Sequence, residues 1–554
     1  MYGPSHTPIH RTGDGQGFQS AVAGSDSVLA LRTVARGCRG PAWGVLICLL
    51  LALCPSPTRA LQRQDSRAPE SPPKHLSSTS ALAAKSPELS KKVRPQAARA
   101  LVRGTIRDRN GIPLAIMPER LTGQDRQLLK PLLAANQPLC QEGAARCYPL
   151  EQAAFHLLGD LRVTRHWAPT RSRFMERELS ARLASPTADV FLSIDARLQR
   201  AAYGVLEQRL KYRWAKKAAV VILDVRTGEI LAQATHPAPP ALAEGLDEVP
   251  PRDDTWYDRS RGVLYPPGST FKMITAMAAL RQDRALRDIP LRCSRLEDKR
   301  VGCLLPDDDR PIRDDQKEKR PHHDVTLFRA ISISCNAYFA QLAWYHLKPE
   351  VLLETAALFG ISLGRPNTAE QITPTLPQTA FGQSEVLLTP LQLASVAATI
   401  ANDGVRVDPS LYAWYDPGWS MPEPVRVVSE EQARFLQDAL RSAVTDGTAK
   451  TLRKGGEKVL LAGKTGTAEV RGPSHAWFAG FAPYRPDPVA PKRRTLAFAV
   501  LVENAGYGAE NAAPIARQLM EEAERLHLFD LPSSTQEETG LATPSPNQGD
   551  IKEN

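Results

Sequence analysis

Five apolar segments with the pattern of buried β-strands lie at the two ends of a long stretch of this chain. Two flank the turn Arg226-Thr227-Gly228 and three follow much later; they span residues 218–225, 229–234, 458–463, 476–481 and 495–502. Helical patterns occupy the interval, including one that begins at Ser269, and another runs from Ala513 to Leu526. Strands this far apart, with helices between them, predict a single antiparallel sheet covered by helices, which is an α+β fold.

Three short motifs contain side chains suited to acyl transfer: Ser269-Thr270-Phe271-Lys272, Ser334-Cys335-Asn336 and Lys464-Thr465-Gly466-Thr467. Pro266-Pro267-Gly268 predicts a helix that starts at Ser269, and residues three apart share one face of a helix. A serine hydroxyl is a weak nucleophile that needs an adjacent base. Lys272 can be that base if burial and a neighbouring positive charge, such as that of Lys464, lower its pKa.

The second motif predicts a proton relay. Ser334 and Asn336 are two residues apart on a short turn, so both side chains can face a cleft. We expect Ser334 to pass a proton to a leaving amine, and Asn336 to hold Lys272 and a substrate amide. Cys335, between them, is expected to point away and pack.

The third motif predicts a carboxylate site at a strand edge. The hydroxyls of Thr465 and Thr467, together with Lys464, suit a terminal carboxylate. Gly466 is expected to let a substrate backbone lie against the strand as an added strand. We therefore predict as catalytic Ser269, Lys272, Ser334, Asn336 and Lys464, and as substrate-binding Thr465, Gly466 and Thr467.

In this order, the motifs resemble the S-x-x-K, S-x-N and K-T-G elements of penicillin-binding proteins and serine β-lactamases. Five further stretches are similar to class B penicillin-binding proteins: 103–111, 148–159, 218–234, 381–394 and 477–483. The resemblance implies a transpeptidase domain, with a five-stranded antiparallel sheet flanked by helices, after a smaller non-catalytic dimerisation or pedestal module. It also implies an oxyanion hole made by the backbone N–H groups of Ser269 and Thr467.

By the same resemblance, the activity is that of a monofunctional peptidoglycan D,D-transpeptidase of the elongation or division type. Ser269 would attack the penultimate D-Ala carbonyl of a stem peptide, and β-lactams would acylate the same serine. A membrane glycosyltransferase is the expected protein partner, and no cofactor is expected. A β-lactam-hydrolysing enzyme or sensor of the same fold, and a catalytically silent scaffold of a wall-synthesis complex, are the alternatives. A bifunctional glycosyltransferase is not favoured, because the sequence before residue 189 is too short for that domain.

Composition and segment boundaries agree with an exported two-domain protein. The 554 residues include 42% hydrophobic ones, and the net charge of +10 is scattered, without the basic runs typical of nucleic-acid binding. Arginines precede an apolar run at 42–54, which predicts a signal peptide or a retained anchor at the inner membrane, with the catalytic domain in the periplasm. The predicted segments are a leader (1–60), a disordered tether (61–94), the non-catalytic module (95–188), the transpeptidase domain (189–532) and a disordered tail (533–554).

The cysteines and one loop raise two further questions. Cys140 with Cys147, and Cys293 with Cys303, are close in sequence, which favours two local disulfides in an oxidising compartment; free buried thiols stay open for each pair. Possible metal ligands also cluster in sequence: Asp314, Asp315, His322, His323 and Cys335. Their spacing lacks the repeated ligand pair of zinc sites, so we interpret them as solvated loop residues and predict no metal site.

Overall fold

The centre of the fold is a five-stranded antiparallel sheet in the order β12-β13-β14-β4-β5. Its strands are β4 (Ala218–Asp224), β5 (Ile230–His236), β12 (Ala462–Val470), β13 (Gly472–Ala482) and β14 (Leu496–Val502). β14 joins the two groups, because Val500 lies opposite both Phe478 of β13 and Val220 of β4. The predicted sheet is therefore confirmed, with early and late strands side by side.

This computed structural model describes residues 103–134, 137–140, 144–161, 174–211, 213–239, 254–306, 308–420, 422–485 and 493–531. The predicted export segment, tether and C-terminal tail lie outside these residues. No helix within the described ranges is both long enough and apolar enough to span a membrane. The predicted segment limits stay predictions.

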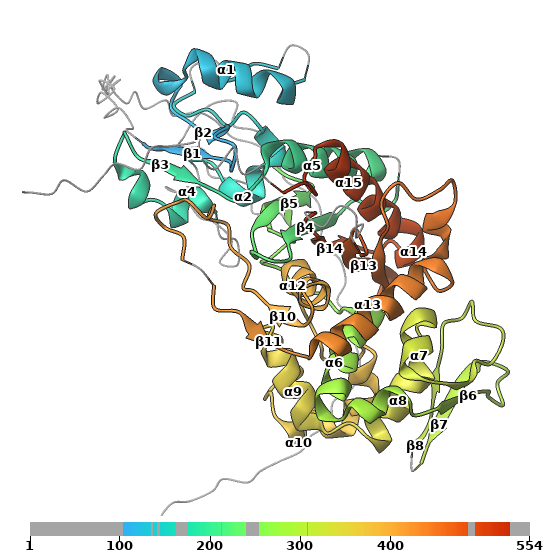
Figure 1. The fold of residues 1–554 in the computed structure, drawn as a ribbon. Helices are drawn as coiled ribbons and strands as arrows, with labels where there is room; N and C mark the ends of the chain where they lie inside the picture. Colours follow the sequence, from blue (N-terminus) through green and yellow to red (C-terminus); the bar gives the residue numbers. More distant parts are fainter. Residues whose placement is uncertain are drawn as a thin grey trace, which may run out of the picture. The chain divides into compact units, whose positions relative to one another are not determined.

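Helices cover the sheet because its strands are apolar on both faces; every residue of β4 and β14 is buried. In Figure 1 the sheet lies between α5 with α15 on one side and α12 with α13 on the other. The α-helices are α1 (Gly123–Leu129), α2 (Phe155–Leu158), α4 (Met175–Glu178), α5 (Ala196–Leu210), α6 (Lys272–Gln282), α7 (Leu327–Ile333), α8 (Asn336–Tyr345), α9 (Pro349–Ala357), α10 (Ala369–Ile372), α11 (Leu376–Ala380), α12 (Pro390–Ala401), α13 (Glu430–Thr445), α14 (Gly508–Asn511) and α15 (Ala513–Arg525).

One strand prediction and one helix prediction need correction. The first late strand begins at Ala462 rather than at Lys458, so the Lys464–Thr467 motif lies within β12 and not at the end of a preceding strand. The predicted helix at Ser269 begins as a 3-10 turn, η6 (Gly268–Phe271), and becomes the α-helix α6 only at Lys272. β12 is the edge strand of the sheet, so its outer side is not covered by another strand of that sheet.

The N-terminal part contains a small sheet in the order β2-β1-β3. β1 (Thr105–Arg107) and β2 (Pro113–Ala115) form an antiparallel hairpin, whose turn places Gly111 at φ +79°. β3 (Asp189–Phe191) pairs in parallel with β1, and Asp195 then caps α5 through its side chain. Strands from the predicted non-catalytic module (95–188) and from the start of the predicted transpeptidase domain (189–532) thus share one sheet.

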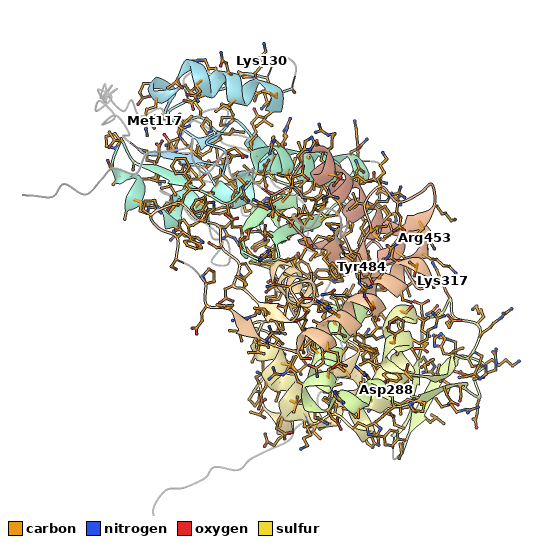
Figure 2. The ribbon with its side chains drawn as sticks, viewed as in Figure 1. Met117, Lys130, Asp288, Lys317, Arg453 and Tyr484 are labelled. Atoms are coloured by element: carbon orange, nitrogen blue, oxygen red, sulfur yellow. A yellow bond between two sulfur atoms is a disulfide. The ribbon has the colours of Figure 1, made fainter. Side chains whose placement is uncertain are left out.

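A four-stranded sheet in the order β8-β7-β6-β9 lies in the chain between α6 and α7, and the sequence patterns did not predict it. Its strands are β6 (Leu291–Arg295), β7 (Val301–Leu305), β8 (Asp308–Arg313) and β9 (His323–Val325). β6, β7 and β8 all pack against α8. The loop after β8 is held to α14, where Lys317 Nζ lies 2.6 Å from Glu510 Oε1 (Lys317 is labelled in Figure 2).

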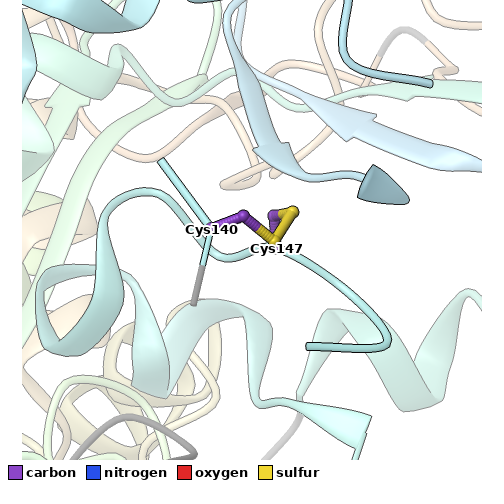
Figure 3. The surroundings of a disulfide bond; sticks show 2 residues. All are labelled: Cys140 and Cys147. Carbon is purple, nitrogen blue, oxygen red and sulfur yellow. A yellow bond between two sulfur atoms is a disulfide. The ribbon is translucent and has the colours of Figure 1, made fainter. Parts of the chain in front are cut away.

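One of the two predicted disulfides forms. Cys140 and Cys147 are bonded, and the backbone of Cys147 bridges Ile116 just after β2 (Figure 3). For Cys293 and Cys303 the other alternative holds, because both thiols are free and buried. They have different partners: Cys293 donates toward an Asp314 oxygen, whereas Cys303 donates toward the Ala337 carbonyl.

We expect replacement of Cys140 and Cys147 by serine to lower the free energy of unfolding by about 2–3 kcal/mol, since the bond closes a short loop in the unfolded chain. Urea unfolding of the oxidised protein and of the double variant measures the difference. The matched control is Cys303→Ser, which breaks no disulfide. When reductant is added, its urea unfolding midpoint should change as that of the wild type does. Equal unfolding midpoints for the oxidised wild type and the double variant would contradict the expectation.

Candidate active site

Ser269 stands on a turn that packs directly against β12. Gly268 adopts φ +52°, and a Cβ at this position would lie 2.6 Å from the Thr467 carbonyl oxygen. A Cβ on Gly466 would lie 2.8 Å from Thr270 Cγ2. The two glycines therefore let the η6 backbone approach β12, which places Ser269 beside Thr467. Gly466 thus has a packing role that the sequence did not predict.

Lys272 follows Ser269 by three residues, and side chains at this spacing eclipse in a 3-10 turn. Its side chain is fully buried. Its Nζ donates to Asn336 Oδ1 at 2.6 Å and to the Ser334 carbonyl at 2.6 Å, and lies 3.3 Å from Ser334 Oγ. The first and second motifs are thus joined by direct hydrogen bonds.

Lys464 approaches the same serine from β12. Its Nζ donates to Ser334 Oγ at 2.7 Å and to the Thr465 carbonyl at 3.1 Å, and its side chain is also fully buried. Ser334 can receive both lysines because it ends α7 in the left-handed conformation, at φ 64°. A non-glycine residue in this region costs about 1–3 kcal/mol, and such strain concentrates at functional sites. Ser334 Oγ therefore bridges the two ammonium groups.

Burial has a strong effect on both lysines. It lowers the pKa of Lys272 to about 8, although the nearby Asp314 carboxylate acts in the opposite direction. Burial, followed by repulsion from Lys272, lowers the pKa of Lys464 well below its usual value. Of the two predicted causes, burial is therefore confirmed for Lys272, whereas the charge effect runs the other way, from Lys272 to Lys464.

The sequence predictions assigned no positioning role to Asp314 or Thr448. Asp314 Oδ1 accepts hydrogen bonds from the N–H groups of Asn336 and Ala337 at the start of α8. The Thr448 hydroxyl lies 2.6 Å from that of Thr465. Neither residue belongs to a recognisable motif, so only the tertiary contacts reveal them.

The structure brings the eight predicted residues to one place, on η6 and the start of α6, on the α7–α8 turn, and on β12. Ser269, Ser334, Asn336 and Thr467 are partly exposed, whereas the two lysines and Thr465 are buried. Cys335 is fully buried and its Sγ accepts the Tyr338 N–H, as a capping side chain of α8. Trp477 Nε1 donates to the Pro266 carbonyl at 3.0 Å, which ties β13 to the segment before Ser269.

The interpretation of the Asp314, Asp315, His322, His323 and Cys335 group as solvated loop residues is wrong for three of its members. Asp314 and Cys335 are buried and His322 is largely buried, and their ligand atoms lie together with Cys293 Sγ, all within 4.8 Å of one another. Asp315 and His323 lie outside this group. No sequence signal links Cys293 to this group, because it is distant in sequence from the other three residues and lies closer to Cys303.

Comparison with known proteins extends these observations. Residues 218–521 match the model of the penicillin binding protein transpeptidase domain. The chain is 33% identical over 380 residues to peptidoglycan D,D-transpeptidase PbpA of Mycobacterium tuberculosis, which covers 60% of this chain and 72% of that protein. It is 26% identical over 377 residues to peptidoglycan D,D-transpeptidase FtsI of Escherichia coli, covering 62% and 57%. The imipenem acyl-enzyme complex of penicillin-binding protein A from M. tuberculosis aligns with a TM-score of 0.57 and 26% identity, over 76% of this chain and 98% of that one.

We expect Gly268→Ala to slow acylation by a fluorescent penicillin by roughly 10–100-fold, because the new Cβ displaces Ser269 from β12. The acylation rate is measured from a time course of covalent labelling, quenched at intervals. Thermal unfolding checks that the variant is folded. Gly204→Ala, in α5 and with open space around its Cβ, is the matched control and should leave the rate unchanged. A normal rate in folded Gly268→Ala would show that the close approach of η6 to β12 is dispensable.

Proposed function

This chain belongs to the penicillin-binding protein transpeptidase family, and we propose from that premise that Ser269 forms the acyl-enzyme of a peptidoglycan D,D-transpeptidase. The function is to cross-link stem peptides in wall synthesis. The observation that carries the residue assignment is the buried network in which Lys272, Ser334 and Lys464 meet beside the Ser269 turn.

In the first step, the Ser269 hydroxyl attacks the carbonyl of the penultimate D-Ala and gives its proton to neutral Lys272. A lysine with a pKa of about 8 is neutral in an appreciable fraction of molecules near neutral pH. The N–H groups of Ser269 and Thr467 are the proposed oxyanion donors, and the Gly268–Thr467 contact supports this by placing the two backbones together. Loss of one such donor typically costs about 2.7–4 kcal/mol.

In the second step, the C–N bond breaks and the terminal D-Ala leaves as an amine. Ser334 is placed to deliver the proton, because its Oγ lies 3.3 Å from Lys272 Nζ and 2.7 Å from Lys464 Nζ. An amine of a neighbouring stem then attacks the ester carbonyl, and Ser269 leaves as a hydroxyl with a proton returned through the same network. Asn336 holds Lys272 in place throughout.

Lys464, Thr465, Gly466 and Thr467 form the proposed site for the terminal carboxylate and peptide backbone. β12 is an edge strand, which suits the addition of a peptide as a further strand. A bound carboxylate brings an opposite charge that raises the pKa of Lys464. Substrate binding and protonation of Lys464 are therefore coupled, and the empty site avoids two buried positive charges.

We also propose that the catalytic domain works in the periplasm, at the inner membrane and beside a glycosyltransferase. The predicted export segment and the Cys140–Cys147 disulfide support an oxidising extracytoplasmic location. The glycosyltransferase supplies nascent glycan whose stems this enzyme joins. An elongation role and a division role are both compatible with this assignment.

Ser269→Ala is expected to abolish covalent labelling by fluorescent penicillin, because no other atom replaces the nucleophile. Labelling is read on a denaturing gel, and intact-mass spectrometry of the wild type should show one added acyl group. Ser185→Ala, an exposed serine of the N-terminal part, is the matched control and should label normally. Unchanged labelling of Ser269→Ala would overturn the assignment of the nucleophile.

The wild type and the Ser269→Ala variant also distinguish the alternative functions. A transpeptidase keeps the β-lactam acyl group for a long time, whereas a hydrolase turns over a chromogenic cephalosporin rapidly. A silent scaffold would be indicated if Ser269→Ala fully restored growth of a strain that lacks the protein.

The rate of acylation is expected to rise with pH through about 8, because the lowered pKa of Lys272 makes it neutral, and so a base, above that value. The rate constant is measured from pH 6 to pH 9 at saturating and subsaturating penicillin, with unfolding temperatures recorded over the same range. A rate that is flat or falls as pH rises would argue against Lys272 as the base.

A further inference from the structure

The ammonium group of Lys317 lies in a small site made by one aromatic ring and two acidic side chains (Lys317 is labelled in Figure 2). Its Nζ is 3.5 Å from the centroid of the Tyr507 ring and 2.6 Å from Glu510 Oε1. The Tyr507 hydroxyl donates to Asp315 Oδ1 at 3.2 Å. An aromatic face beside carboxylates binds an alkylammonium cation through cation–π attraction and charge-assisted hydrogen bonds. Asp315, Tyr507 and Glu510 are called the ammonium site below.

Lys317 holds this site weakly. Of its side chain 58% is exposed, and so is 59% of the Glu510 side chain. An ion pair this exposed contributes little to stability, so a second ammonium group can take the place of Lys317. The hydrogen bond from Glu510 raises the pKa of Lys317, which shows that the site favours an amine in its charged form.

The ammonium site joins the two walls of the groove proposed for the donor peptide. One wall is the turn that carries Asn336. The Asn336 side-chain amide donates to the Arg313 carbonyl at 2.9 Å, and Asp315 follows two residues later. Asp315 therefore reaches the ammonium site from the side of the proton relay.

The other wall is the edge strand β12, and Tyr507 is held against it on both sides. The Gly506 N–H donates to the Ser474 carbonyl at 2.8 Å, next to the hairpin that joins β12 to β13. A Cβ on Gly508 would lie 2.5 Å from the Gly466 carbonyl oxygen. Tyr507, between these two contacts, therefore stands beside the part of β12 that follows Gly466.

The direction of the donor peptide decides which of its groups reaches this place. In the proposed function, Lys464 and Thr465 hold the terminal carboxylate, and the carbonyl under attack meets the N–H of Thr467. The residue before the two D-alanines then lies beyond Thr467, on the same side as Tyr507. Every stem peptide carries the amine through which it can serve as an acceptor. A donor that is not yet joined through this amine presents it, charged, near the ammonium site.

We propose that the ammonium site is a subsite for the free side-chain amine of the donor stem, and that Lys317 occupies it until the donor binds. This inference deepens the proposed function and rests on it. No covalent bond changes in the subsite: the ammonium group of the donor replaces Lys317 Nζ over the Tyr507 ring and against Glu510. The enzyme thereby selects donors whose amine has not already been used in a cross-link.

The test uses full-length Ser269→Ala protein, which binds donor peptides without being acylated. Two peptides ending in Lys-D-Ala-D-Ala are compared, one with a free lysine side-chain amine and one with that amine acetylated, and binding is measured by ligand-observed NMR. We expect the free amine to bind at least about 5-fold more tightly. When Glu510→Gln or Tyr507→Leu is added, the two peptides should bind equally.

Lys317→Ala distinguishes a subsite from a contact that merely holds the loop. Loss of Lys317 empties the subsite, so the preference for the free amine should rise at least about 2-fold, whereas Glu510→Gln should abolish it. A contact that only held the loop would be broken by either change, and both would then shift the preference in the same direction. The matched control is Lys319→Ala, a lysine of the same loop that donates to the Gln316 carbonyl, and it should keep the preference of the parent protein.

Acylation of the wild type separates this proposal from the proposed function. The same two peptides, now ending in D-Ala-D-lactate, are expected to release D-lactate at least about 5-fold faster when the amine is free. Equal rates and equal binding of the two peptides, or the same shift in Lys317→Ala and Glu510→Gln, would overturn the subsite and leave Ser269 as the nucleophile. If the free-amine preference in binding were present but neither peptide released D-lactate or left an acyl group on the wild type, the proposed function would be overturned and the subsite would stand.

Discussion

The active site depends on the burial of two lysines side by side. Lys272 and Lys464 come from different parts of the chain, and both side chains are fully buried. Burying two charged ammonium groups together costs much free energy. Ser334, Asn336 and backbone carbonyls offer them neutral oxygens in place of countercharges. The arrangement therefore favours loss of a proton from the pair, which is the condition for a lysine to act as a base.

This network needs three elements to meet, and close backbone packing makes that possible. The glycines at 268 and 466 let η6 lie against β12, and a side chain at either position would strike a neighbouring atom. A third glycine, Gly447, lets the turn after α13 lie against the Ser332 carbonyl at the end of α7. Thr448 of that turn then contacts Thr465 on β12. The nucleophile, the relay turn and the edge strand are thus held by contacts between backbones, which tolerate little displacement.

The small sheet between α6 and α7 gives the relay turn a second support. Asp314 reaches from the end of β8 to the start of α8, and the loop that follows it is held by Lys317 at Glu510 and Tyr507. Its carboxylate also stands near enough to Lys272 to oppose the fall in that lysine's pKa. The same side chain therefore positions Asn336, adjusts the electrostatics of Lys272 and accepts from the buried thiols of Cys293 and Cys335.

The sequence by itself determined the chemistry and the presence of the main sheet. The apolar strands at 218–234 and 458–502, with helical patterns between them, predict one antiparallel sheet, and the three motifs identify a nucleophile, a base and a relay by residue type and spacing. The tertiary structure decided what local patterns cannot encode. It showed that the charge effect between the two lysines runs from Lys272 to Lys464, and that Cys293 faces Asp314 and Cys335 instead of bonding Cys303. Burial and side-chain direction arise only when distant segments pack, so a position in the chain does not reveal them.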